Sequence, residues 1–300
     1  KTSTVGGFIG GIHENDGNRD GSSVTFDSCN SESDTIDVQA HSDIQIGGFI
    51  GNMTNNGYFN VEMKNSFNKV KEIKTNSESD SHVGGFIGWI GRNGKSDLKI
   101  ENCESNNIIN VAGNHSDVGG FIGIASRNRV MNVAFKSVTN KAKITVKTKG
   151  YQTNVGGIVG SVEENPLMTL TMDNVTNCAD TKARKENSGC TERSVSIWDE
   201  NKQECGGYNG GFVGRVDLMN DGTNFSMTVS NSVNNGTIAS DCLASESCGL
   251  FCVSSESFLD DRTVDVKNSI NKGDVFGNVS YGIASKVTKA ENIVSMGNVN

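Results

Sequence analysis

One hexapeptide, Val-Gly-Gly-Phe-Ile-Gly, recurs along this chain and limits what it can fold into. It occupies residues 5–10, 83–88 and 118–123, with close variants at 46–51, 155–160 and 209–214. Two degraded copies begin near Cys248 and Tyr281. The spacing is about 35–40 residues, except for a longer gap after residue 160. A nearly constant period of this length predicts a repeat architecture.

A second motif follows each hexapeptide. Apolar and polar residues alternate and lead into an Asn-Ser turn, most clearly at residues 264–273. Alternation with period two predicts strands, and strands this short become stable when copies stack in parallel. We therefore predict an all-β fold, a parallel β-solenoid of about eight repeats with no cap at either end. Residues 1–300 form one domain, with a loop insertion at about 179–208.

Stacking places equivalent residues in columns along the solenoid. The glycines that flank the phenylalanine either allow the chain to bend sharply or allow another layer of backbone to approach closely, and the sequence leaves both reasons open. The predicted structural repeat residues are Gly6, Gly7, Phe8, Gly47, Phe49, Gly84, Phe86, Gly119, Phe121, Gly156, Gly210 and Phe212, and Ile158 and Phe251 are expected to continue the phenylalanine column. Ladders of amide side chains are predicted in two columns. One consists of Asn65, Asn102, Asn174, Asn231 and Asn268, and the other lies three residues further on and includes Asn68, Asn140, Asn177, Asn234 and Asn271.

Together, these two motifs resemble the GLUG-type repeat. The resemblance is carried by Gly6-Gly7-Phe8-Ile9-Gly10 and its copies, and by Asn268-Ser269 through Gly273-Asp274-Val275. It covers nearly the whole chain, although Phe stands where the family has Leu and the connection between the two blocks is longer. The resemblance implies a secreted or cell-surface, adhesin-like β-solenoid, and it supplies no catalytic residues.

Charge and composition exclude several function classes. The formal net charge is −8 and no basic stripe is present, so nucleic acid is not an expected partner. No run approaches the roughly 18 apolar residues that span a bilayer. The chain begins inside a repeat and without Met, so we expect it to be an excerpt of a longer repeat protein.

Eight cysteines are present. Cys29 and Cys103 lie two repeats apart, too far for a disulfide, and are expected to be buried thiols. A pair between Cys190 and Cys205 would close the base of the insertion. Cys242, Cys248 and Cys252 are further disulfide candidates, with Cys178 as an alternative partner, and their connectivity stays open. A structural zinc site is the alternative to disulfides, but the chain has no Cys-x₂-Cys pair. Disulfides in turn favour an extracellular location.

The insertion carries Trp198, which either anchors a partner or covers the loop's own small core. Glycosylation candidates are Asn52, Asn114, Asn224, Asn235 and Asn278, whereas a glycan at the sequon of Asn174 would disturb the amide ladder. Residues 16–21 weakly resemble a calcium loop but lack its distal glutamate, so calcium is a secondary alternative and no other cofactor is expected.

No catalytic site is evident. The sequence His-Ser-Asp occurs at residues 41–43 and 115–117, but neighbouring residues of an extended chain point to opposite faces, which favours a turn role. Residues 260–262, Asp-Asp-Arg, are interpreted as a charged turn. We predict a non-catalytic extracellular or cell-surface scaffold or adhesin-like stalk. Its partners would be copies of itself, joined end to end or laterally into a filament, or an extracellular protein or glycan.

The alternative is a carbohydrate-binding or polysaccharide-processing β-helix. Such a protein needs a groove with aromatic residues and two acidic residues from adjacent coils. The two Trp and four Tyr of the chain offer little material for it.

Overall fold

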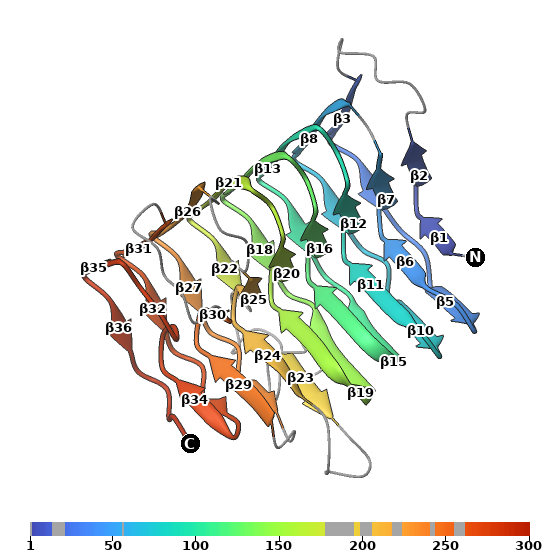
Figure 1. Ribbon diagram of the computed structural model, residues 1–300. Coiled ribbons are helices and arrows are strands. Elements are labelled where there is room, and N and C mark those ends of the chain that lie inside the picture. The colour runs from blue at the N-terminus through green and yellow to red at the C-terminus, as the bar shows by residue number, and fades with distance from the viewer. Residues whose placement is uncertain are drawn as a thin grey trace.

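The chain is a parallel β-solenoid of about six turns (Figure 1). The computed structural model describes residues 2–13, 22–55, 57–177, 195–198, 206–217, 224–240, 244–254 and 262–300. Within these ranges every strand pairing is parallel and no helix occurs, so none of the described chain offers an apolar helix of membrane-spanning length. The final coil is short, since Lys289 pairs with Asp265, only 24 residues earlier.

Four sheets run along the solenoid axis. Sheet A comprises β1 (Ser3–Gly6), β5 (Thr35–Ala40), β6 (Ile44–Gly47), β10 (Glu72–Ser77), β11 (Asp80–Gly84), β15 (Ile108–Gly119), β19 (Lys143–Gly156), β23 (Val195–Trp198), β24 (Gly206–Gly210), β28 (Ile238–Ser240), β29 (Ala244–Cys248), β33 (Val275–Phe276) and β34 (Val279–Tyr281). Sheet B comprises β2 (Ile9–His13), β7 (Ile50–Thr54), β12 (Ile87–Gly91), β16 (Ile122–Ser126), β20 (Val159–Glu163), β25 (Val213–Asp217) and β30 (Phe251–Val253).

The other two sheets follow in the same order in each coil. Sheet C comprises β3 (Ser22–Asp27), β8 (Tyr58–Lys64), β13 (Lys95–Glu101), β17 (Val130–Lys136), β21 (Leu167–Asp173), β26 (Asn224–Ser230), β31 (Arg262–Lys267) and β35 (Lys289–Glu291). Sheet D comprises β4 (Asn30–Ser31), β9 (Phe67–Asn68), β14 (Glu104–Ser105), β18 (Thr139–Asn140), β22 (Thr176–Asn177), β27 (Val233–Asn234), β32 (Ile270–Asn271) and β36 (Val294–Ser295).

Two separate apolar cores lie inside the coils. The larger one collects the inward side chains of sheets B and C, such as Ile87 and Ile100, and of the segments beside them, such as Phe86. The smaller one belongs to sheet A and includes Ile73 of β10 and Val83 of β11. In each coil the chain first passes through one half of sheet A, which contains β5 and β10 and which we call the outgoing half. It then runs through a second half, the returning half, which contains β6 and β11 and leads to sheet B. Strands β15 and β19 run through both halves.

The hexapeptide forms the arch that connects the returning half of sheet A to sheet B. Its first two residues end a sheet A strand, the next two make the bend, and its Ile begins the sheet B strand. A Cβ on Gly84 would collide with the carbonyl oxygen of Ile87 across the bend. A Cβ on Gly88 would lie 2.6 Å from the backbone nitrogen of Ile46 in the preceding coil. The first glycine is therefore required by the bend, and the last by the approach of another backbone layer.

The phenylalanines stack as a ladder along the axis. Ring centroids are 4.6 Å apart for Phe49–Phe86 and 4.7 Å for Phe86–Phe121, with nearly parallel planes. The prediction that Phe251 continues this column is wrong by one residue. Phe251 pairs with Val213, whereas the amide of Phe212 donates to the carbonyl of Leu250. The degraded hexapeptide therefore begins at Ser247, and Leu250 takes the place of the phenylalanine.

The first predicted column of asparagines lies at the corner between sheets C and D. All five of its residues have left-handed backbone, with φ between 48° and 55°, a conformation that Asn tolerates better than most residues. Their side chains are exposed and do not form an unbroken ladder: Asn102 donates to Asn65 and Asn268 to Asn231, but Asn174 donates to Ser137 and Asn231 to Asp173. The corner is selected for its backbone conformation rather than for amide pairing.

An unbroken amide ladder lies three residues further along the chain. Asn140 donates to Asn177, Asn177 to Asn234 and Asn234 to Asn271, at 2.7–2.8 Å. All four side chains are completely buried. A second buried ladder joins Asn93, Asn128 and Asn165 at the corner between sheets B and C. Stacking satisfies these amides because each one finds its partner in the next coil.

One disulfide joins Cys248 and Cys252, whose Cα atoms are 5.6 Å apart. The strand register equates Cys248 with Gly210, and Cys252 falls where the last hexapeptide glycine stands in other coils. The bond therefore crosses the arch at the place where glycines normally meet. Cys29 and Cys103 are free thiols, and Cys103 is buried. Cys178, Cys190, Cys205 and Cys242 lie outside the described residues.

The predicted insertion at about 179–208 contains residues of two sheet A strands. Residues Val195–Trp198 form β23, which pairs with β19 and β28, and β24 begins at Gly206. The alternating sequence Val-Ser-Ile-Trp supplies the sheet A strand that the repeat requires. Trp198 is in register with Lys147, and its side chain lies outside the described residues, as do residues 178–194 and 199–205.

We expect Gly88→Ala to lower the free energy of unfolding by about 2 kcal/mol or more, because the new methyl group meets backbone that cannot move aside. Gly10→Ala is the matched control at the equivalent position of the first coil, where the nearest atom to a Cβ would be 3.7 Å away. Urea denaturation of both variants measures the difference. Equal loss of stability in the two variants would contradict this account of the arch.

Candidate functional site

The outer faces of sheet B and of the returning half of sheet A face each other across the arch. Near the bend the two layers touch through glycine backbone, and further out they separate to form a cleft of about 480 Å³. We call this space the interlayer cleft. Its lining comes from successive coils, so it extends along the solenoid axis.

Each wall of the interlayer cleft is a column of equivalent positions. The sheet A wall holds Gln45, His82, Asp117 and Asn154, which are in register on β6, β11, β15 and β19. The sheet B wall holds Asn52, Trp89, Ile124, Ser161 and Arg215, with Ser126, Glu163 and Asp217 two residues further on. Asn52 donates to Gln45 across the cleft, and the rings of His82 and Trp89 lie 5.7 Å apart.

A chain of charged and amide groups runs through the cleft across four coils. Nδ1 of His82 lies 3.1 Å from Asp117, and Nδ2 of Asn154 donates to Asp117 at 2.9 Å and to Glu163 at 3.4 Å. Arg215 then reaches Glu163 at 3.1 Å and Asp217 at 2.5 Å. Its guanidinium also lies 5.5 Å from the ring centroid of Tyr208.

The two carboxyl groups that share Asn154 differ in acidity. Burial, reinforced by the negative charge of Asp117, raises the pKa of Glu163 to about 7 despite the nearby Arg215. Burial also opposes the charge of Asp117, but hydrogen bonds from His82 and Asn154 outweigh it and hold the pKa of Asp117 below its usual value. The same contact raises the pKa of His82 against the effect of its burial. At neutral pH the cleft therefore holds a charged Asp117 next to a Glu163 that is partly protonated.

The mouth of the cleft carries the more exposed groups. The indole nitrogen of Trp89 donates to Ser126 at 3.0 Å, and the guanidinium of Arg92 lies 5.5 Å from the Trp89 ring. Two further ion pairs border the opening, between Arg127 and Glu164 and between His115 and Asp80. The mouth thus presents one half-buried aromatic ring among groups of both charges.

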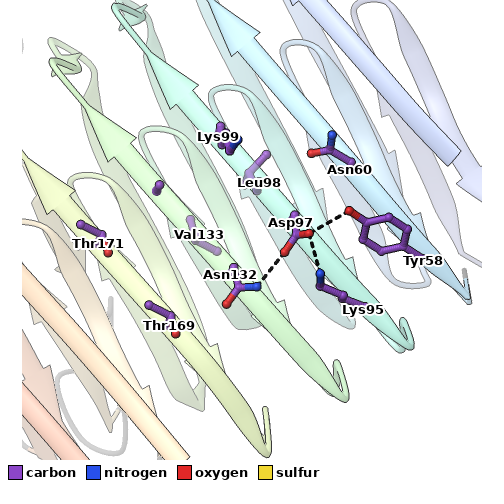
Figure 2. Close-up of a pocket in the computed structure, with 11 residues that line it drawn as sticks. Tyr58, Asn60, Lys95, Asp97, Leu98, Lys99, Asn132, Val133, Thr169 and Thr171 are labelled. Carbon is purple, nitrogen blue, oxygen red and sulfur yellow. Dashed lines mark hydrogen bonds and ion pairs between the residues drawn. The ribbon is translucent and has the colours of Figure 1, made fainter. Parts of the chain in front are cut away.

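A second, shallower cleft of about 390 Å³ lies on the outer face of sheet C (Figure 2). Its centre is Asp97, which accepts from Tyr58 at 2.9 Å and Asn132 at 2.7 Å and pairs with Lys95 at 3.0 Å (Figure 2). Asp97 is thus saturated by its neighbours on the same face, and these contacts hold its pKa below the usual value although partial burial opposes this. This surface has fewer groups available for a ligand than the interlayer cleft.

The predicted glycosylation sites differ in accessibility. Asn52 is a poor candidate, because its side chain is buried in the interlayer cleft and bonded to Gln45 and Thr4. Asn224 and Asn278 are exposed, Asn235 is half-buried, and Asn114 is half-buried with its amide donated to the carbonyl of Glu78.

The repeated His-Ser-Asp sequences do not form a nucleophile and base. His115 pairs with Asp80 and His41 with Glu78, while Asp117 pairs with His82 of the preceding coil. Residues 16–21 and 260–261 lie outside the described part of the chain. Within the described part, no three His, Cys, Asp or Glu side chains gather in a way that could hold a metal ion.

The residues of the interlayer cleft were missed by the sequence analysis. His82, Asp117, Asn154 and Arg215 occupy two recurring positions, the residue before each hexapeptide and the first residue after it. A signal was present, since these positions are mostly polar beside an apolar hexapeptide. What the sequence lacked was any indication that the two positions face each other.

Comparison with known proteins adds no family to this description: no protein-family model matches the chain, and neither a curated protein nor a solved structure is significantly similar to it.

Stability should fall as the pH rises from about 4.5 towards 7. The raised pKa means that the folded state keeps a proton on Glu163 that the unfolded chain releases. The resulting stabilisation of the folded state is complete at acid pH and is lost as the pH rises through the pKa of Glu163 in the folded state. Its size is at most on the order of 3 kcal/mol. Glu163→Gln should flatten this part of the pH profile of unfolding free energy, whereas Glu101→Gln, on the outer face of sheet C, should not. An unchanged slope in Glu163→Gln would show that Glu163 is not the group that titrates.

Proposed function

We propose that this chain is a non-catalytic, adhesin-like scaffold of the extracellular space or cell surface that holds a glycan strand in its interlayer cleft. In this proposal the chain has about eight GLUG-like coils, and stacking provides a stiff body on which the cleft is displayed. The observation that carries the proposal is the construction of the cleft from equivalent positions on successive coils.

A cleft built in this way suits a linear polymer. Its wall groups recur once per coil along the axis, so a chain of sugar residues lying in the cleft would meet amide, hydroxyl and charged groups at each step. The half-buried ring of Trp89 supplies an apolar surface at the mouth. An apolar ring with a few converging polar groups is the usual composition of a small-ligand site.

Other polymers fit this cleft less well. Nucleic acid would be repelled by the excess of carboxylates along the walls. A peptide that binds by adding a strand needs a free sheet edge, and the strands of both cleft walls are already paired on each side within the stack. A glycan needs neither a basic surface nor an edge.

Polysaccharide processing is the second candidate function, and one observation favours it. Asp117 and Glu163 come from adjacent coils, contact the same amide and have pKa values shifted in opposite directions, as an acid and base pair would require. Both carboxyl groups are, however, already bonded to basic partners, His82 and Arg215. Binding therefore accounts for the geometry better than hydrolysis does.

An extracellular location is supported by the Cys248–Cys252 disulfide and by the exposed sequons at Asn224 and Asn278. Assembly into filaments is supported by apolar side chains on the two terminal coils, where Phe8 is 48 % exposed and Met296 69 %. In this proposal further coils, from the same polypeptide or from another copy, cover these surfaces.

Binding to a glycan array should identify ligands for the intact chain, and Trp89→Ala should weaken that binding roughly tenfold by removing the aromatic surface. Tyr58→Ala on the face of sheet C is the matched control and should bind normally. Reducing ends should not accumulate when a bound polysaccharide is incubated with the protein. Their release, lost in Glu163→Gln, would replace the scaffold proposal by the processing one.

Electron microscopy of the concentrated chain tests the assembly proposal. We expect rods joined end to end, with an axial repeat equal to the length of one chain. Substituting Met296 by Lys should shorten or abolish such filaments without changing the individual rod. A field of single rods at every concentration would mean that copies of this chain do not join through their terminal coils.

A further inference from the structure

The interlayer cleft carries an excess of negative charge. Among its lining residues are six carboxylates and only three guanidinium groups, namely Asp43, Asp80, Asp117, Glu163, Glu164 and Asp217 against Arg92, Arg127 and Arg215. The other titratable groups that face the cleft are His82, His115 and Tyr208. Walls of low dielectric strengthen the attraction of such a cleft for a positively charged ligand.

The excess is concentrated at the inner network. There the carboxylates of Asp117 and Glu163 contact one imidazole and one guanidinium, and the same guanidinium also contacts Asp217. Arg215 and Asn154 both donate to the same oxygen of Glu163, Oε1. Its second oxygen, Oε2, has no donor among the described residues, and one-fifth of the side chain is exposed in the cleft. Glu163 is thus a carboxylate with an acceptor available to a ligand.

The neighbouring Asn154, whose Nδ2 contacts Glu163, also has an acceptor without a donor. Asn154 is 96 % buried within the cleft wall, and its Oδ1 has no hydrogen-bond partner in the described structure. The orientation of this amide is determined by its surroundings, because Nδ2 donates to the carboxylates of Asp117 and Glu163. A buried acceptor without a donor is unfavourable, and a ligand group that donates hydrogen bonds would relieve it.

An ammonium group matches both features, because it has three donors, no acceptor and a positive charge. We infer that the inner end of the interlayer cleft, around Glu163 and Asn154, binds the free amino groups of a glycan, as in a polymer of glucosamine. This inference rests on the proposed function and specifies its ligand class. A hydrated metal ion fits less well, since the described residues offer no cluster of three acidic or imidazole ligands.

The Arg215 side chain completes the subsite. Its NH1 and NH2 nitrogens bind Glu163 and Asp217, and its buried Nε has no acceptor in the described structure. A sugar ring offers hydroxyl oxygens close to its amino group, so one residue of an amino glycan supplies both the donor and the acceptor that the subsite lacks. Lysine side chains offer the ammonium without the neighbouring hydroxyl groups.

Calorimetric titration with two matched oligosaccharides tests the inference. The probes are the hexamer of glucosamine and the hexamer of N-acetylglucosamine, at pH 7, close to the pKa of Glu163, where a bound ammonium group would favour the carboxylate form. We expect the glucosamine hexamer to bind roughly tenfold more tightly or better, because charged hydrogen bonds form only with the free amine. The preference should diminish in high salt, a measurement that needs no variant.

Two variants assign the preference to the cleft. Glu163→Gln should bind the two hexamers equally, and a thermal melt verifies that it is folded. Glu101→Gln, which changes a carboxylate on the outer face of sheet C, should keep the wild-type preference. Retention of the preference in folded Glu163→Gln would overturn the assignment to Glu163.

The outcomes separate this inference from the proposed function. If both hexamers, or other glycans on the array, bind without regard to a free amine, the inference is wrong and the glycan-binding proposal stands. If no glycan binds at all, the proposed function fails first. If hexalysine binds as tightly as the glucosamine hexamer, the cleft recognises basic peptides and the amino-glycan inference is wrong.

Discussion

The close contact of two backbone layers at the hexapeptide arch is the constraint on which the rest of the structure depends. Where Gly88 meets Ile46 there is no room for a side chain, so the returning half of sheet A and sheet B can lie face to face only if glycine recurs there in each coil. That contact creates two apolar cores instead of one. It also places the interlayer cleft at the edge of the contact. Two described coils lack both glycines, and one of them joins the same two positions covalently, through Cys248 and Cys252.

Parallel stacking satisfies the polar groups that such an architecture buries. The chain is rich in Asn, and fully buried amides such as Asn177 would destabilise an ordinary core. Here each donates to the equivalent amide of the next coil, so the ladder of Asn140, Asn177, Asn234 and Asn271 is closed except at its ends. In the phenylalanine ladder each ring likewise buries its apolar surface against the equivalent ring of the next coil. A modest apolar content suffices because neighbouring coils, rather than a single centre, provide the packing.

The interlayer cleft departs from this regularity, and its departures are where ligand chemistry is possible. Its walls hold different residues in each coil, so His82, Asp117 and Asn154 bond to unlike neighbours along one column. Burial in this column, reinforced by the negative charge of Asp117, raises the pKa of Glu163. Positions that repeat the same residue serve the fold, whereas positions that vary within a polar column are the ones available for recognition.

The sequence by itself determined the period, the strand class, the parallel stack and the columns of glycine and phenylalanine, because a repeat reveals which residues occupy equivalent places. It misplaced the register of the seventh hexapeptide by one residue, since Ser247-Cys248 no longer contains the glycine that marks the start. It predicted amide ladders in both asparagine columns, but the exposed column at the corner is interrupted, because conformation and pairing favour the same residue type. Only the tertiary structure decided that the columns of Asp117 and Glu163 face each other: a period defines columns, but the bend between two sheets determines which columns meet.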